Sequence, residues 1–439
     1  MFEFLFVILF FLFPVLALYV YKYIFKESIL KVGILNFLLI SIFVFAYIGI
    51  IFLFFHMDPL RVSNGVIDRE TIFLVWFFSS LSIFFIMLGG GVAKKTLSLA
   101  DSHFSIERIK KINNIQRLKS YIFIVIGIVF LYLYIKAVPE IAIFNIFSFE
   151  SKSGIQSLRS DMGNNFEGSY FLYSIFMEDI LKFLLFSFYA QWLVFHNKKD
   201  LYVVLFLFVV NGFIALMATE KAPLIWLIVG MFLVNTIICR KGLIPIKSIF
   251  KISIPIFSIL ICMYMFFMKS LSVSDAFNSV LSRTFTGSIT PAYFYLELFP
   301  EHYDFLYGKS FPNPKGIFPY EPVRLTVLVM NWVNPQLEQL GIVGTMPTVY
   351  WAEIYANFGP IFIAPFSFFI GFVLRILDSI ILKFRELPIG AGYYVWVILY
   401  FRSLSVTSFS NFILNITLII ITLVFVFISM KKLKLSYVR

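Results

Sequence analysis

Charged residues are scarce in this chain: they make up 14% of its 439 residues, whereas an average soluble domain carries about 25%. Hydrophobic residues account for 60% and aromatic residues for 20% of the sequence, and phenylalanine alone contributes 58 residues. This balance excludes an ordinary soluble enzyme. It is typical of helices that face lipid, because the bilayer core offers no water to polar groups.

Sequence motifs of soluble enzymes and of metal sites are also missing. The chain has no Walker A loop, no glycine-rich dinucleotide turn, no HExxH and no DxD or DDxxD cluster. A metal-held diphosphate or a nucleotide cofactor is therefore not indicated. The two cysteines, Cys239 and Cys262, are too few for a disulfide framework. We predict neither a metal nor a cofactor.

Long apolar stretches dominate what the sequence does contain. A membrane-spanning helix needs roughly 20 predominantly apolar residues. We predict an all-α polytopic membrane protein with about eleven such helices, at 2–22, 32–55, 71–93, 120–138, 171–195, 201–218, 222–239, 252–271, 348–374, 389–410 and 411–430.

Lysine and arginine are distributed unevenly between the segments that connect these helices. The connecting segments alternate between two sets, one for each side of the membrane. The set that starts with 22–31 and ends with 431–439 holds 23 lysines and arginines, whereas the other set, whose segments are longer in total, holds 12. Because cationic loops stay in the cytoplasm, we predict an outer amino terminus and a cytoplasmic carboxyl terminus. The same pattern accounts for the net charge of +12 without a nucleic-acid partner.

Two of the predicted outer segments are long, 136–170 and 269–347. The second connects predicted helices 8 and 9, and its many prolines and aromatic residues favour an ordered cap over a flexible linker. No internal repeat is visible. We therefore treat residues 1–439 as one membrane domain with this large loop on its outer face.

Charged residues near the outer ends of the apolar stretches are candidates for a functional site, because charge close to hydrocarbon is costly and usually serves a function. They are Glu178, Asp179, Lys182, Glu220, Lys221, Glu353 and Arg402. Glu178 and Lys182 also have the i,i+4 spacing of a helix ion pair, so a purely structural role is the alternative for them.

Arginines in the outer segments form a second group of candidates: Arg159, Arg283 and Arg324. The planar guanidinium group matches two oxygens of a phosphate or a carboxylate. Several arginines around one outer cavity, together with Arg402 and Lys221, would suit a lipid-linked diphosphate. Any one of them alone would also suit an anchor at the membrane surface.

One stretch of the chain resembles a known family. GTMPTVYWAEIYANFGPIFIAP, residues 344–365, looks like the Pro-Thr, Glu and Tyr-Asn-Phe-Gly signature of bacterial oligosaccharide repeat-unit polymerases, the O-antigen and capsule polymerases of the Wzy type. LYGKSFPNPKGIFPYEP, residues 306–322, is similar to the loop before that signature. ATEKAPLIWLI, residues 218–228, stands where many members have a Ser-Arg-Gly turn, with Lys221 in place of the arginine. Arg159 is followed by Gly168, two positions short of the Arg-x10-Gly motif of some members.

The resemblance implies a metal-independent glycosyltransferase on the outer face of the bacterial cytoplasmic membrane. It would transfer a growing glycan from undecaprenyl diphosphate to an incoming lipid-linked repeat unit of lipopolysaccharide O-antigen or capsule, with a chain-length regulator protein as a further partner to expect. Glu353 is then the first candidate for the general base and His302 the second. Diphosphate and substrate binding would fall to Arg159, Arg283, Arg324, Arg402, Lys221, Tyr355 and Asn357.

Two other activities stay open. A polysaccharide ligase of related plan would transfer the glycan to a different acceptor, and the sequence separates it poorly from a polymerase. A flippase for lipid-linked oligosaccharide would be a transporter. We would expect it to show repeated halves and polar residues near mid-bilayer in many helices.

Overall fold

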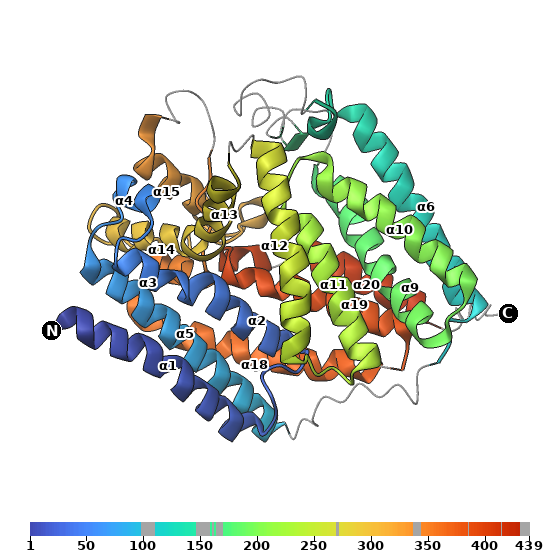
Figure 1. Ribbon diagram of the computed structural model, residues 1–439, viewed down its shortest axis with the longest axis horizontal. Coiled ribbons are helices and arrows are strands. Elements are labelled where there is room, and N and C mark those ends of the chain that lie inside the picture. Colours follow the sequence, from blue (N-terminus) through green and yellow to red (C-terminus); the bar gives the residue numbers. More distant parts are fainter. Residues whose placement is uncertain are drawn as a thin grey trace. The chain divides into compact units, whose positions relative to one another are not determined.

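A computed structural model gives the fold of residues 1–97, 110–145, 159, 162–163, 170–268, 272–336, 344–384, 386–413 and 415–430 (Figure 1). These residues form helices and no β-strand. Nine helical segments among them are long and apolar enough to cross a membrane: Phe2–Phe25, Ile34–Phe54, Arg69–Thr96, Asn114–Ala137, Lys198–Met217, Ala222–Cys239, Ile246–Phe266, Pro360–Phe384 and Phe409–Ser429. The protein is therefore an all-α, multi-pass membrane protein, as predicted.

The two remaining predicted spans, 171–195 and 389–410, are also largely helical. The first corresponds to α8 (Tyr170–Tyr173), the π-helix η4 (Ser174–Ile180) and α9 (Leu181–Phe195). The second begins as α19 (Pro388–Arg402), which has 15 residues and hence a length of about 22 Å, less than a hydrocarbon core of roughly 30 Å. The count of eleven crossings stays a prediction.

The predicted span 348–374 is divided in the structure. Helix α17 (Tyr350–Phe358) ends at Gly359, whose φ of +81° and ψ of −179° are accessible almost only to glycine. Pro360 follows and lacks the N–H group that a continuing helix needs. The candidate membrane span starts there, so α17 is a short helix that precedes it.

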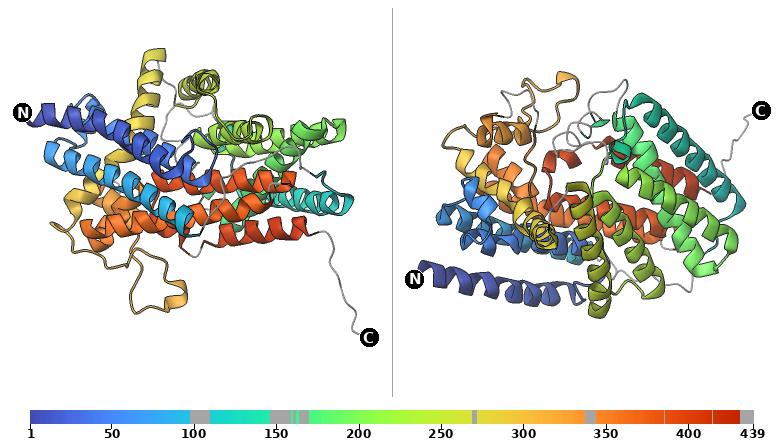
Figure 2. Two further views of the ribbon diagram at one scale, coloured as in Figure 1. Left: turned by 90° about the horizontal axis from the view of Figure 1, so that it is seen from below. Right: turned by 45° about the horizontal axis from the view of Figure 1, so that its top comes forward.

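The chain folds into two compact units, and the first comprises Met1–Asp101, Asn278–Ser379 and Tyr400–Asn415. Its helices are α1 (Phe2–Phe25), α2 (Ile34–Ile42), η1 (Phe43–Tyr47), α3 (Gly49–Phe54), α4 (Pro59–Ser63), α5 (Arg69–Thr96), the end of α13 (Val273–Leu281), η5 (Ser282–Thr286), α14 (Gly287–Leu298), η6 (Pro314–Gly316), α15 (Leu325–Val333), α17, η7 (Pro360–Phe362), most of α18 (Ile363–Ile381), the end of α19, η9 (Ser403–Ser405) and η10 (Phe409–Phe412). Helix α1 (dark blue) lies along α5 (light blue), as Figures 1 and 2 show. Asp68 caps the amino end of α5 by accepting hydrogen bonds from the N–H groups of Glu70 and Thr71.

Helix α14 lies within the predicted outer loop 269–347 and forms part of the core of the first unit. It packs against α3, α5 and α17, and its Tyr295 is fully buried. A glycine makes the approach at its amino end possible: a Cβ atom at Gly49 would lie 1.9 Å from the carbonyl oxygen of Phe285. The described part of this loop is thus ordered and largely helical.

The second unit comprises Ser102–Phe277, Ile380–Leu399 and Ile416–Arg439. Its helices are α6 (Asn114–Ala137), η3 (Ala142–Asn145), α8, η4, α9, α10 (Lys198–Met217), α11 (Ala222–Cys239), α12 (Ile246–Met268), most of α13, η8 (Leu382–Phe384), most of α19 and α20 (Ile416–Ser429). Helix α9 packs against α10 and α11, and α6 packs against η4 (Figure 1). Most of the predicted outer segment 136–170, together with residues 431–439, lies outside the described residues.

Polar contacts within each unit agree with the predicted alternation of outer and cytoplasmic ends. In the first unit, Arg375 lies 3.7 Å from Glu27, and both belong to predicted cytoplasmic ends. In the second unit, Arg117 lies 2.7 Å from Asp200, again between predicted cytoplasmic ends. The contacts of Asp58, described below, join predicted outer segments. These contacts fix which ends belong together, while the direction of the chain across the membrane stays a prediction.

Candidate functional site

A cavity of about 450 Å³ in the first unit contains two of the predicted site residues, Glu353 and Arg324. We call it the Glu353 pocket. Polar side chains from four separate segments line it: Ser310, Arg324, Thr326, Thr345, Glu353, Thr407, Ser408, Ser410 and Asn411. The fold therefore brings a carboxylate, a guanidinium group and several hydroxyl groups to one hollow.

Glu353 lies in the first turn of α17 and is only 2% exposed. Its Oε1 accepts a hydrogen bond from the Ser310 hydroxyl at 2.7 Å. Its Oε2 accepts one from the backbone N–H of Ser410, also at 2.7 Å. Both carboxylate oxygens are thus held in fixed directions at the wall of the pocket.

Burial raises the pKa of the Glu353 carboxyl group, although the hydrogen bonds from Ser310 and Ser410 oppose this shift. A carboxylate with a raised pKa is a stronger base than an ordinary glutamate carboxylate. Perturbed carboxyl groups in a hollow are typical of catalytic acids and bases. The general-base role of Glu353 stays a prediction.

Asn357 holds the segment that supplies Ser310, and Tyr355 bonds to the end of α14. Asn357 Nδ2 donates to Ser310 Oγ and to the Glu353 carbonyl, both at 2.8 Å, and Asn357 Oδ1 accepts from the backbone N–H of Gly308 at 3.0 Å. The Tyr355 hydroxyl donates to the carbonyl of Phe299 at 3.0 Å. Neither side chain lines the Glu353 pocket. The structure therefore gives Asn357 a supporting position beside Glu353 and Ser310, and Tyr355 a contact with α14.

Arg324 is an exposed residue at the amino end of α15. Within the described part of the chain, no carboxylate forms an ion pair with it. Its positive charge is therefore available to an anion that enters the pocket. A guanidinium group beside hydroxyl groups suits phosphate oxygens, which accept from both.

Three other predicted residues of the first unit lie outside the lining of this pocket. Arg402 is half-buried at the end of α19. His302 is exposed, and its ring packs 5.4 Å from that of Trp332, measured between centroids. Arg283 is exposed in the π-helix η5. The structure does not bring these side chains to Glu353.

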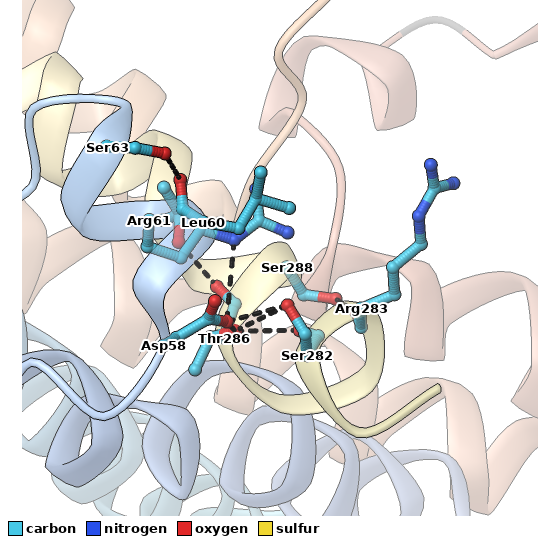
Figure 3. Close-up of polar contacts among 9 residues, drawn as sticks. Asp58, Leu60, Arg61, Ser63, Ser282, Arg283, Thr286 and Ser288 are labelled. Atoms are coloured by element: carbon cyan, nitrogen blue, oxygen red, sulfur yellow. Dashed lines mark hydrogen bonds and ion pairs between the residues drawn. The ribbon is translucent and has the colours of Figure 1, made fainter. Parts of the chain in front are cut away.

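Arg283 stands beside a hydrogen-bonded cluster centred on Asp58, from which its side chain points away (Figure 3). Asp58 Oδ2 accepts from the hydroxyl groups of Ser282 at 2.6 Å and Thr286 at 2.5 Å. Arg61 Nε lies 3.8 Å from the same oxygen. Burial raises the pKa of Asp58, but these donors and Arg61 outweigh it, so its pKa is lowered overall. The sequence signal for this cluster is the i,i+3 spacing of Asp58 and Arg61 at the start of α4, and neither residue is among the predicted site residues.

Two predicted cations, Arg159 and Lys221, belong to the second unit. Arg159 Nη2 lies 3.1 Å from Glu220 Oε1, and Lys221 Nζ lies 4.3 Å from the centroid of the Tyr264 ring. The predicted set of cations is therefore divided between the two units. Within the first unit, only Arg324 of this set lines the Glu353 pocket.

No family model, no curated protein and no solved structure matches this chain. Within the residues that the structure describes, no three histidine, cysteine, aspartate or glutamate side chains group as a metal site would require. The candidate site consequently consists of the residues of the Glu353 pocket and of Asn357, which supports it.

Proposed function

We propose that this protein is a glycosyltransferase that polymerises lipid-linked oligosaccharide repeat units on the outer face of the bacterial cytoplasmic membrane. One observation carries the proposal: Glu353 and Arg324 line the same pocket. Glu353 belongs to the stretch 344–365 on which the family resemblance depends, and Arg324 follows the stretch 306–322 by two residues. A base beside a cation that an anion can reach is the pair of groups this reaction needs.

In the proposed reaction a hydroxyl group of the incoming repeat unit attacks the anomeric carbon of the growing glycan. Glu353 takes the proton of that hydroxyl, the new glycosidic bond forms, and the bond between the sugar and the diphosphate breaks. Undecaprenyl diphosphate leaves with the bonding electrons, and Arg324 stabilises its developing charge. The proposal needs no nucleotide, because the sugar already carries a diphosphate leaving group.

The predicted topology places this pocket on the correct side for such a substrate. Its residues come from the segment before the candidate span Pro360–Phe384 and from the short connection after α19. The positive-inside pattern assigns both to the outer face. A chain-length regulator protein, if one is present, would act from the same side.

Gene deletion followed by analysis of surface glycan length tests the proposal. The deletion strain should display single repeat units in place of a ladder, and the wild-type gene should restore the ladder. Arg324→Ala should leave single repeats, whereas Lys309→Ala should restore the ladder, because Lys309 is an exposed cation of the same segment that does not line the pocket. Membrane abundance of both variants is measured in parallel.

Three outcomes would contradict the proposal. A deletion strain that displays no glycan and accumulates lipid-linked units inside would indicate a flippase. Normal-length polymer that is no longer attached to its final acceptor would indicate a ligase. A full ladder with Arg324→Ala at normal abundance would remove Arg324 from the site.

A further inference from the structure

The second unit contains a separate polar cavity of about 250 Å³, which we call the Glu178 pocket. Residues of α6, α8, η4, α9, α10 and α11 line it, together with Arg159, Met162, Gly163, Ala218 and Glu220. The polar side chains among them are Tyr134, Arg159, Tyr170, Glu178, Lys182, Asn211 and Glu220. The proposed reaction at the Glu353 pocket uses none of them.

A π-helix shapes the inner wall of the Glu178 pocket. The wider turn of η4 (Ser174–Ile180) interrupts the helix that contains Glu178 and Asp179, and such interruptions occur often at functional sites. Glu178 lines the pocket, while the adjacent Asp179 accepts a hydrogen bond from Trp396 Nε1 at 3.0 Å. The two neighbouring carboxylates therefore have different surroundings, and of the two only Glu178 lines the cavity.

The polar groups of the pocket are held in place by their neighbours. The Tyr170 hydroxyl donates to Glu178 Oε1 at 3.0 Å, and the Tyr134 hydroxyl donates to the carbonyl of Met162 at 2.8 Å. Asn211, only 3% exposed, is fixed by a bond from its Nδ2 to the carbonyl of Leu207 at 2.8 Å. A site whose side chains are already oriented loses little freedom when a ligand binds.

The charges of the lining indicate the class of ligand. The formal charges of Glu178 and Glu220 balance those of Lys182 and Arg159, so the lining has no net positive charge to attract a diphosphate. Sugar hydroxyl groups suit this lining, because they donate to carboxylates and accept from lysine and arginine.

The size of the cavity limits the ligand further. Pockets for drug-sized ligands measure roughly 300–1,000 Å³, and this one is smaller, which suits a single sugar ring. We propose that the Glu178 pocket binds one sugar residue of a glycan. That this glycan is the lipid-linked repeat unit rests on the proposed function; the sugar site itself depends only on the lining described here.

Binding of a soluble oligosaccharide to the full chain in lipid nanodiscs tests the proposal. The probe is the repeat-unit oligosaccharide released by mild acid from the surface glycan of the source strain, and its affinity is measured by calorimetry. Gly163→Leu adds a bulky side chain at a residue that lines the pocket, where a Cβ atom meets nothing within 4 Å. Gly212→Leu is the matched control: its Cβ also meets nothing within 4 Å, but Gly212 does not line the pocket.

We expect Gly163→Leu to weaken binding at least about ten-fold, equivalent to about 1.4 kcal/mol, and Gly212→Leu to leave it unchanged. Glu178→Gln should weaken binding by a similar factor, since a charged acceptor binds hydroxyl groups about twice as strongly as a neutral one. Its control is Glu140→Gln, which changes a carboxylate that accepts from Asn145 at 3.2 Å outside the pocket.

The results separate this proposal from the proposed function. Arg324→Ala should abolish polymer while leaving oligosaccharide binding intact. A chain that binds the sugar but fails the deletion test would retain this site and lose the polymerase assignment. Absence of binding to the wild-type chain, equal affinity of Gly163→Leu and Gly212→Leu, or displacement of the sugar by inorganic diphosphate would each overturn the sugar site.

Discussion

The change Glu353→Gln separates a catalytic role for this side chain from a purely structural one. In the wild type, both carboxylate oxygens accept hydrogen bonds, from Ser310 Oγ and from the N–H group of Ser410. A glutamine can keep the bond from Ser410 through its amide oxygen. Its amide nitrogen can donate to Ser310 Oγ, which already accepts from Asn357. The substitution therefore preserves the local packing and removes the basic group.

The two roles predict different magnitudes. A positioned general base contributes roughly 10²–10⁴ in rate, or about 2.7–5.5 kcal/mol of barrier. The expected loss of unfolding free energy is smaller. A charge-assisted hydrogen bond of roughly 1.5–3 kcal/mol is replaced by a neutral one of about 1 kcal/mol. Removal of a buried charge offsets part of this difference. We expect a rate at least about 100-fold lower with unfolding nearly unchanged.

The pH dependence gives an independent readout. Burial raises the pKa of Glu353, and a base acts only when it is ionised, so wild-type activity should fall as pH drops through this raised value, above the ordinary glutamate pKa of about 4.3. The Gln variant should lack this acidic limb. The assay is the initial rate of undecaprenyl diphosphate release across pH, with thermal unfolding measured on the same samples and exposed Glu301→Gln as control. A rate within ten-fold of wild type, with the limb intact, would refute Glu353 as the base.

Four further predictions concern the support of the site and its chemistry. Asn357→Leu should cost about 3 kcal/mol of unfolding free energy, since it removes three hydrogen bonds worth roughly 1 kcal/mol each; an unchanged melting temperature would contradict this. Gly359→Ala should cost about 1–3 kcal/mol, because alanine is strained at the backbone angles of Gly359, which a denaturation midpoint would reveal. Asp58 has a lowered pKa, so its stabilisation should be complete above the unfolded aspartate value of about 3.9 and disappear as pH falls through the lower folded value. Asp58→Asn should remove that pH dependence of unfolding, and a wild-type profile would contradict it. Chelation with EDTA should leave polymerisation intact, and a loss that added Mg²⁺ or Mn²⁺ restores would contradict the proposed chemistry.

Helical content and the approximate position of the spans follow from apolar length alone. The ends of the helices follow less directly, because they depend on single capping residues. Helix α5 starts at Arg69, directly after its cap Asp68 and two residues before the predicted boundary of 71. Helix α6 starts at Asn114, six residues before the predicted boundary of 120, because Asn113 forms a capping box with Gln116. Caps of this kind have a sequence signal, a polar cap residue before the first helical turn, and this signal would have predicted where both helices start.

The candidate site was only partly predictable. The signature around Glu353 selected α17, and Arg324 was selected for its guanidinium chemistry; the structure shows that both residues line one pocket. Glu353 is held by Ser310 and Ser410, which lie 43 and 57 residues away in sequence. These contacts depend on tertiary packing that no local sequence pattern encodes. The same applies to the Asp58 cluster, whose hydroxyl donors lie more than 200 residues away.

The arginines illustrate the limit of reasoning from residue type. Arg159 and Arg324 both occupy predicted outer segments and have the same chemistry, yet they belong to different units. Arg159 forms an ion pair with Glu220, whereas Arg324 lines the pocket that contains Glu353. Sequence position near the membrane surface selects both, and only the three-dimensional arrangement separates them.

Reconstitution of the purified chain with lipid-linked repeat units of its own strain tests the central claim most directly. The wild-type protein should join repeats into lipid-linked oligomers and release one undecaprenyl diphosphate for every new glycosidic bond, and Arg324→Ala should do neither. Repeat units that stay single in the presence of the folded wild-type protein would contradict the account, as would oligomers formed equally well by Arg324→Ala.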